Sequence, residues 1–268
     1  MRMFACLIAV VASAWPVFAA DAAPDTTKSP PSKLPALAEG KTWQLKWSDE
    51  FDGKEIDASR WEVIGDAPRR DGFWTKSAAA LDGKGNLMLS TAKEGDRYVS
   101  GAVRTLHKFE HAFGYWEARC KMPTQVGHWP AFWLMPPGGL PDGEGKGREG
   151  TEIDIMEKAS LKNMVQHTLH WDGYGAHHKS EGKEINREGL NEGFHTYAVW
   201  WTPESYVFYI DGEETWRSTA GGVCQGPVYT KLTEEIGPWA GKISEAKLPD
   251  QFVVDYVRVY EVVDAGKH

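Results

Sequence analysis

The chain has 268 residues, a formal net charge of −8 at pH 7, and an unusual wealth of tryptophan (13) and glycine (28). Its 41% hydrophobic and 25% charged residues are ordinary values for a globular protein, so the composition excludes a disordered chain and a coiled coil. The acidic balance argues against a nucleic-acid-binding protein, which normally presents a basic face, and mildly against a polyanionic substrate.

The first 20 residues have the pattern of a secretory signal peptide. A short positive start is followed by an apolar run over residues 4–18 and by small residues at 19–22, where we expect cleavage. The run is shorter than the ~20 residues that a membrane-spanning helix needs. We therefore expect a secreted or periplasmic protein with no membrane segment after cleavage. Residues 21–40, rich in Ala, Pro, Ser and Lys, are expected to form a disordered linker.

Apolar residues recur with a period of two over residues 41–264, which indicates β-strands. No stretch with a helical period is longer than about two turns. Asp211-Gly212 predicts a hairpin turn. The expected strands lie, in chain order, at residues 42–47, 86–91, 114–122, 199–210, 213–218 and 252–261. This pattern predicts one all-β domain over residues 41–264, an antiparallel sandwich of two sheets.

Two cysteines, Cys120 and Cys224, follow the expected cleavage site. A pair in an exported protein can form one disulfide. However, Cys120 alternates with Trp116 and Ala118 on the core-facing side of an expected strand, so a buried free thiol is an equal alternative.

Three acidic residues follow a long loop at residues 136–150, which contains six glycines and three prolines. Glu152 and Asp154 alternate with isoleucines, so both acids share one face of a strand. Simple alternation would turn Glu157 toward the core, where a lone carboxylate is costly. One extra residue, a β-bulge near Ile155-Met156, would return Glu157 to the acidic face.

With such a bulge, the backbone positions of Glu152 and Glu157 are ~13 Å apart, and their side chains can bring the two carboxyls to about 5 Å. That separation is typical of a retaining glycosidase. Like charges at this distance raise the pKa of at least one acid, which leaves a protonated acid beside an ionised nucleophile. The alternatives are solvated acids on an edge strand, or a calcium site, although calcium prefers ligands looped around the ion.

Aromatic residues precede this segment and a histidine follows it. Trp129 and Trp133 are four residues apart in a short strand and share a face, where an indole can stack on a sugar ring; core packing is the alternative. His170 lies on the next expected strand, on the same face as Thr168. A histidine there can hold a proton or a sugar hydroxyl, although a purely structural hydrogen bond is the more common role.

These segments together resemble glycoside hydrolase family 16, in its laminarinase-like branch. The acid motif over residues 152–157 has the bulged form seen in that branch. The resemblance spans about residues 43–261. Besides the acid motif it rests on the segments 47–51 (WSDEF), 114–119 (GYWEAR), 129–133 (WPAFW) and 254–260 (VDYVRVY), and on His170.

The resemblance implies a β-jelly-roll of two antiparallel sheets with a concave substrate cleft, and endo-hydrolysis of β-glycosidic bonds with retention of configuration. By motif position, Glu152 corresponds to the nucleophile, Glu157 to the acid/base, and Asp154 to the helper that fixes the geometry and the proton of the nucleophile. The residues that we assign to substrate binding are Trp74, Arg104, Trp129, Trp133 and His170. We also expect residues 171–178 to form a loop over the cleft, with Tyr174, His177 and His178.

No cofactor is required for this chemistry. Some relatives bind calcium near the opening and closing strands, which here would involve Glu50 and Asp255; buried polar partnership is the preferred alternative for these two acids. The expected substrate is a neutral polysaccharide, β-1,3- or mixed-linkage β-1,3-1,4-glucan, hydrolysed by a monomer.

Other readings of the same residues remain open. A sulfated or neutral galactan is the enzymatic alternative, because a single cation can bind a sulfate. The candidates for such a cation are Arg69, Arg70, Lys76 and Arg104. A transglycosylase would use the same intermediate, and a non-catalytic carbohydrate-binding protein would use only the cleft.

Overall fold

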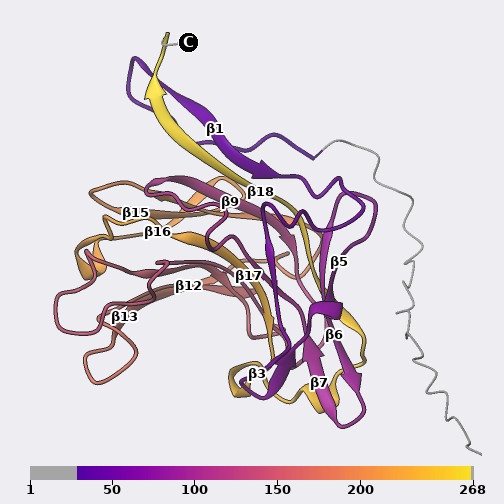
Figure 1. Ribbon diagram of the computed structural model, residues 1–268. Helices are drawn as coiled ribbons and strands as arrows, with labels where there is room; N and C mark the ends of the chain where they lie inside the picture. Colours follow the sequence, from indigo (N-terminus) through magenta and orange to yellow (C-terminus); the bar gives the residue numbers. More distant parts are fainter. Residues whose placement is uncertain (1–28, 267–268) are drawn as a thin grey trace, which may run out of the picture.

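The computed structural model describes residues 29–266, which form two β-sheets packed face to face (Figure 1). The expected signal peptide lies outside the described residues. Within residues 29–266 no helix is long and apolar enough to cross a membrane. The helical segments there are four 3-10 helices, η1 (Lys76–Ala78), η2 (Ala220–Gly222), η3 (Pro238–Ala240) and η4 (Ile243–Glu245).

The larger sheet has eleven strands and the smaller sheet has seven. The eleven strands are β1 (Lys41–Asp49), β3 (Ala67–Arg69), β4 (Gly72–Trp74), β5 (Ala79–Leu81), β6 (Leu87–Glu94), β7 (Arg97–Ser100), β9 (Gly114–Lys121), β14 (His195–Trp201), β15 (Tyr206–Ile210), β16 (Glu213–Ser218) and β18 (Asp250–Asp264). They are antiparallel except where β4 meets β7. β1 pairs with the second half of β18, and this pair projects from one end of the molecule (Figure 1).

The seven-stranded sheet carries the acid motif near its middle. Its order is β13-β12-β11-β10-β17-β8-β2, and every neighbouring pair is antiparallel. The bounds are β2 (Glu62–Ile64), β8 (Ala102–Arg104), β10 (Trp129–Met135), β11 (Glu152–Glu157), β12 (Met164–Trp171), β13 (Lys179–Asn186) and β17 (Tyr229–Glu235). The two sheets together form the expected all-β jelly-roll sandwich.

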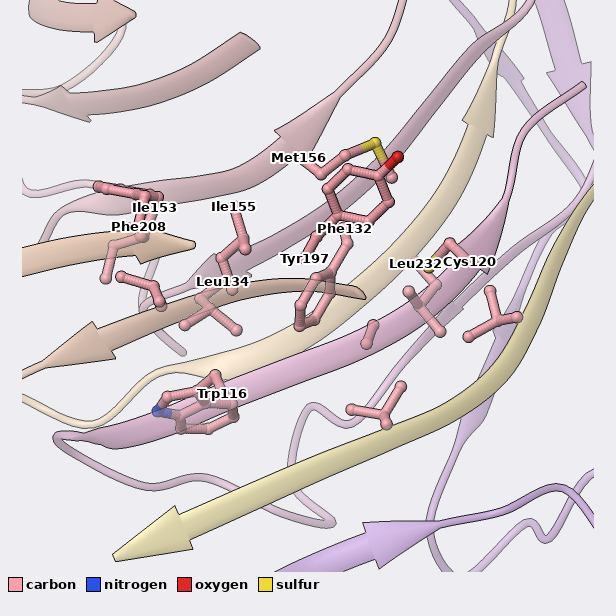
Figure 2. Packing of buried hydrophobic residues seen from close by; sticks show 14 of the residues in the cluster. Trp116, Cys120, Phe132, Leu134, Ile153, Ile155, Met156, Tyr197, Phe208 and Leu232 are labelled. Atoms are coloured by element: carbon pink, nitrogen blue, oxygen red, sulfur yellow. The ribbon is translucent and has the colours of Figure 1, made fainter. Parts of the chain in front are cut away.

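The core lies between the sheets because most inner strands place apolar side chains at every second position. Figure 2 shows Phe132, Leu134, Ile153 and Ile155 from the seven-stranded sheet packed with side chains of the other sheet such as Trp116. The opposite side chains of the seven-stranded sheet point away from the core. We call this side, which carries Glu152, Asp154, Trp133 and Lys231, the open face.

Two sequence expectations need correction. The run 199–210 is not one strand: Thr202 turns the chain by accepting backbone hydrogen bonds from Glu204 (3.2 Å) and Ser205 (3.1 Å) through its Oγ1, and β14 and β15 flank that turn. In addition, the part of the expected linker that the structure describes is packed. Ser32 donates a hydrogen bond to Glu117 (2.5 Å), so residues 29–40 contact the large sheet.

Other expectations are confirmed. β15 and β16 form the hairpin, and Asp211 and Gly212 adopt the positive φ values (54° and 80°) that a tight turn between twisted strands requires. Cys120 and Cys224 are both buried and free, which settles the two alternatives in favour of thiols.

Candidate active site

A β-bulge in β11 places all three acids on the open face. Trp133 of β10 pairs with Asp154, whereas the preceding Phe132 pairs with Met156, so Ile155 is the extra residue. Ile155 and Met156 are both fully buried in the core. The bulge therefore absorbs one residue and turns Glu157 outward, as the cost of burying a lone carboxylate predicts.

Glu152 is held by a residue from outside the sheet. Its side chain is 8% exposed, and its Oε2 accepts a hydrogen bond from the hydroxyl of Tyr174. Tyr174 belongs to the segment between β12 and β13, which the sequence places over the cleft. That segment therefore reaches the acid motif directly.

Glu157 and Asp154 have partners on the neighbouring strands. The indole nitrogen of Trp129 donates to Glu157 Oε1 (2.9 Å), and the Thr168 hydroxyl donates to Glu157 Oε2 (3.4 Å). Asp154 Oδ2 lies 3.4 Å from Nε2 of His170, on β12. The structure thus brings two of the expected substrate-binding residues, Trp129 and His170, to the acids.

Burial raises the pKa of all three carboxyls, but not equally. For Asp154 and Glu157 the pKa rises well above the ordinary value, because desolvation is reinforced by the charge of the neighbouring acids. The pKa of Glu152 is also raised by burial. There, however, the Tyr174 hydrogen bond and the positive charge of His170 and Lys231 act in the opposite direction. Glu157 is therefore the acid that its acidic neighbours help to keep protonated, and Glu152 is the acid whose ionised form its neighbours stabilise.

Two loops meet beside Glu152 and fix the position of Tyr174. Asp172, fully buried, accepts hydrogen bonds from the backbone N–H groups of Gly145 (3.1 Å) and Lys146 (2.7 Å) in the glycine-rich loop. Gly173 packs so closely on Asp142 that a Cβ would lie 2.6 Å from its Oδ1. These contacts hold the long loop at residues 136–150 against the segment that carries Tyr174, and we call them the latch.

Trp74 and Trp133, both assigned to substrate binding from the sequence, are largely buried. Trp74 is 7% exposed and Trp133 is 8% exposed. The Lys231 ammonium lies 3.7 Å from the ring centre of Trp133, and the Arg69 guanidinium lies 4.8 Å from that of Trp74. A cation therefore lies over one ring face of each tryptophan, as the Arg70 guanidinium does over Trp129 at 4.1 Å.

The cations that were candidates for a sulfate site have different surroundings. Arg104 is held by both oxygens of Glu62 (2.8 Å each), so its charge is compensated. Arg69 and Arg70 share the single carboxylate of Glu235, which is 4% exposed. Lys76 is exposed in η1 and lies outside this group.

Sequence reasoning missed Lys231, Glu235 and Trp239. Lys231 and Glu235 lie on the same face of β17. From the sequence, this strand looks like a polar, solvent-facing segment, because Leu232 is flanked by polar residues. Tyr229, Lys231 and Glu235 all occupy odd-numbered positions of the strand, and this was the indication in the sequence that their side chains share one face. Trp239 is 42% exposed and packs edge-on against Trp129, with ring centres 4.8 Å apart.

The residues considered for calcium do not fit such a site. Both oxygens of Glu50 accept hydrogen bonds from Arg258 (2.9 and 2.7 Å). Asp255 pairs with Arg119 (2.6 Å) and accepts a hydrogen bond from Ser29 (2.8 Å). Each carboxylate is already neutralised by its own arginine, which supports their interpretation as buried polar partners.

A buried carboxyl with its pKa raised well above the ordinary value, beside a second acid on the open face of a β-sandwich, is an arrangement suited to acid-assisted hydrolysis of a glycoside. Comparison with known proteins names the family. The model of "Glycosyl hydrolases family 16" matches residues 67–258, and the chain belongs to this family of endo-glycanases.

Relatives of known name differ in the polysaccharide on which they act. A keratan-sulfate endo-1,4-beta-galactosidase of Sphingobacterium multivorum is 29% identical, over 97% of this chain and 67% of that protein. A beta-glucanase of Rhodothermus marinus is also 29% identical, over 83% of this chain and 86% of that protein. The crystal structure of a laminarinase from Flavobacterium sp. UMI-01 superposes with a TM-score of 0.68 at 28% identity, covering 81% of this chain and all of that one.

Proposed function

We propose that this protein is a secreted endo-acting β-glycanase that works by retaining double displacement. In the first step Glu157 donates its proton to the glycosidic oxygen while the carboxylate of Glu152 attacks the anomeric carbon. The bond to the leaving sugar breaks, and a glycosyl ester of Glu152 forms.

The second step restores both residues. Glu157, now ionised, accepts a proton from a water molecule, and that water attacks the anomeric carbon. The ester bond breaks, the sugar leaves with its original configuration, and Glu152 is again a carboxylate. Asp154 assists by its charge, which opposes the ionisation of Glu157. No metal or organic cofactor takes part, and a monomer suffices.

One observation carries this proposal: the three acids share one face of β11 but have different partners. Glu157 receives neutral donors, the Trp129 indole and the Thr168 hydroxyl. Glu152 receives the Tyr174 hydroxyl and faces positive charge. An acid and a nucleophile at pH near neutrality need this difference.

The first candidate substrate is a neutral β-1,3- or mixed-linkage β-1,3-1,4-glucan. The similarity to a beta-glucanase and to a laminarinase supports this choice. The net charge of −8 is also better suited to a neutral polymer than to a sulfated one.

A sulfated galactan is the second candidate, because one observation favours it. Arg69, Arg70 and Lys231 carry three positive charges around the one carboxylate of Glu235, which leaves a local excess of positive charge on an acidic protein. The similarity to a keratan-sulfate endo-1,4-beta-galactosidase points the same way.

The first experiment measures reducing ends released from laminarin, lichenan, agarose, carrageenan and keratan sulfate, with Glu152→Gln beside the wild type. We expect release from one class of polymer and a loss of at least about 10⁴-fold in the variant, because the nucleophile is removed. Glu144→Gln, an exposed acid of the nearby loop, is the matched control and should leave the rate unchanged. Retained activity in a folded Glu152→Gln variant would refute the mechanism.

The stereochemical outcome and the product type complete the test. Proton NMR of the first-formed anomer should show the β-form, whereas an inverting enzyme would release the α-form. Products without new reducing ends would instead identify a transglycosylase.

A further inference from the structure

Tyr174 combines an exposed ring with a hydroxyl that reaches a buried acid. The residue is 59% exposed, yet its hydroxyl donates a hydrogen bond to Oε2 of Glu152, which is 8% exposed. A surface tyrosine has many rotamers available in water, so a contact of this kind needs a backbone that aims it.

The backbone that carries Tyr174 is held on both sides. Asp172 adopts φ of 63° and binds the backbone of Gly145 and Lys146, while Lys179 lies 3.4 Å from the same carboxylate. On the other side His178 is hydrogen-bonded to His170 (2.9 Å), and their rings stack with centres 5.1 Å apart. The loop is therefore fastened at its start and at its end, and Tyr174 lies between the two fastenings.

We propose that Tyr174 is a positioning residue for the reaction: its hydroxyl orients the carboxylate of Glu152 and keeps it ionised for attack. This inference rests on the proposed function, in which Glu152 is the nucleophile. The ring, which faces solvent beside the acid, is left free to contact the sugar that the acid attacks.

The hydroxyl acts as a permanent donor. The pKa of Tyr174 is raised by burial of its oxygen and by the negative charge of Glu152, so the phenol stays protonated across the working range. A hydrogen bond from a neutral donor stabilises a carboxylate more than the glycosyl ester that replaces it, because only the carboxylate carries a full charge. The contact therefore favours release of Glu152 in the second step as well.

Other charged and titratable groups also face Glu152, and the hydroxyl works among them. They are Asp154 and Glu157 of the same strand, His170 of β12, Lys231 and Tyr229 of β17, and Arg69 of β3. Removal of the Tyr174 hydroxyl leaves all of these in place, so a change in Glu152 can be traced to the one hydrogen bond.

The test is Tyr174→Phe, which deletes the hydroxyl and keeps the ring. We expect kcat to fall about ten- to hundredfold, the range for loss of a hydrogen bond to a charged group, while KM changes less than about threefold. The acid limb of the kcat/KM profile should move upward by roughly one to two pH units, because the pKa of Glu152 is no longer lowered. Tyr98→Phe, on β7 beside Lys93, is the matched control and should change none of these values.

A second measurement reports on the carboxyl without turnover. The carboxyl carbon of Glu152, assigned by its absence in Glu152→Gln, is titrated by ¹³C NMR in wild type and Tyr174→Phe. A higher pKa in the variant supports the inference. An unchanged Glu152 pKa together with an unchanged or faster kcat overturns it, since the hydroxyl would then only occupy space that the substrate must clear.

The two proposals fail in different ways. A wild-type protein that hydrolyses none of the polymers overturns the proposed function, and with it any part of Tyr174 in a reaction. An active wild type in which Tyr174→Phe leaves the acid limb and the Glu152 pKa unmoved and does not lower kcat overturns only the role of Tyr174.

Discussion

At the scale of single residues, the three acids of β11 differ in how far their pKa is raised. Burial next to another acid raises the pKa of a carboxyl. Glu157 has Asp154 as a neighbour and only neutral hydrogen-bond donors. Glu152 has the Tyr174 hydroxyl and nearby cations. Desolvation raises the pKa of both acids, but the acidic neighbours of Glu157 add to this rise and the neighbours of Glu152 oppose it, which suits a proton donor at one position and a nucleophile at the other.

The charge of Asp154 should be visible in the pH profile. Asp154 raises the pKa of Glu157 by repulsion, so Asp154→Asn should lower that pKa and move the alkaline limb of kcat to lower pH. The rate should fall less than in Glu152→Gln, because the nucleophile remains. Asp96→Asn, an exposed aspartate on a turn, is the control. An alkaline limb that stays in place in Asp154→Asn would argue against its helper role.

At the scale of elements, the site depends on two loops that are fastened to each other. The fully buried carboxylate of Asp172 satisfies two backbone N–H groups of the loop at residues 136–150. Backbone groups buried without a partner are costly, so this one side chain determines where both loops lie. The same latch positions Tyr174, two residues further along the chain.

Replacement of Asp172 should show how much stability its acceptor oxygens and its left-handed backbone conformation provide together. Asp172→Ala removes both acceptors and places alanine at φ of 63°, which should cost about 3 kcal/mol of stability. Asp172→Asn keeps one acceptor oxygen, and asparagine tolerates that conformation, so about 1 kcal/mol is expected. Urea unfolding of the wild type and both variants gives the order of their free energies of unfolding. Equal losses of stability in the two variants would contradict the proposed role of the Asp172 hydrogen bonds.

At the scale of the whole molecule, the segment before β1 belongs to the folded domain. Ser32 donates to the buried carboxyl of Glu117, and Tyr256 donates to the same oxygen (2.9 Å). Leu34 packs with the aromatic cluster on the outer side of the large sheet. Residues 29–40 therefore contribute to stability rather than serving as a free tether.

The contribution of Ser32 should depend on pH. Burial raises the folded-state pKa of Glu117 above its value of 4.5 in an unfolded chain, and the Ser32 hydrogen bond opposes that rise. A raised carboxyl pKa means that stability falls as pH rises from 4.5 through the folded pKa. Ser32→Ala should enlarge this fall, with a loss of about 1–2 kcal/mol at pH 7 and a smaller loss at pH 4.

Urea unfolding at both pH values measures the Ser32 effect. The exposed Ser244→Ala is the matched control and should be neutral at either pH. A loss that is equal at pH 4 and pH 7 would show that the Ser32 contact is not coupled to the ionisation of Glu117.

Much of the site could be predicted from local patterns. The conflict between alternation and a charged Glu157 was enough to predict the bulge, because a buried lone carboxylate is too costly to accept. Alternation likewise placed Glu152 and Asp154 on one face and His170 on the matching face of the next strand. These inferences hold because each depends on neighbours within one or two strands.

The surroundings of the aromatic rings could not be predicted in this way. Trp133 and Lys231 are close because β10 and β17 pair, although they are 98 positions apart in the chain. Arg104 meets Glu62 through the pairing of β8 with β2. Whether a ring face is open to a sugar or covered by a cation depends on such pairings, and no short motif records them.

The fold class, the bulged acid strand and the faces of its residues therefore follow from the order of amino acids alone, since they arise from backbone geometry and the cost of burying charge. The packing of residues 29–40, the cations over the tryptophans and the hydrogen bond from Tyr174 to Glu152 are properties of the tertiary structure. They depend on which distant segments the fold brings within a few ångströms of one another. At that range, the neighbouring group determines whether a charge is neutralised, exposed or available for reaction.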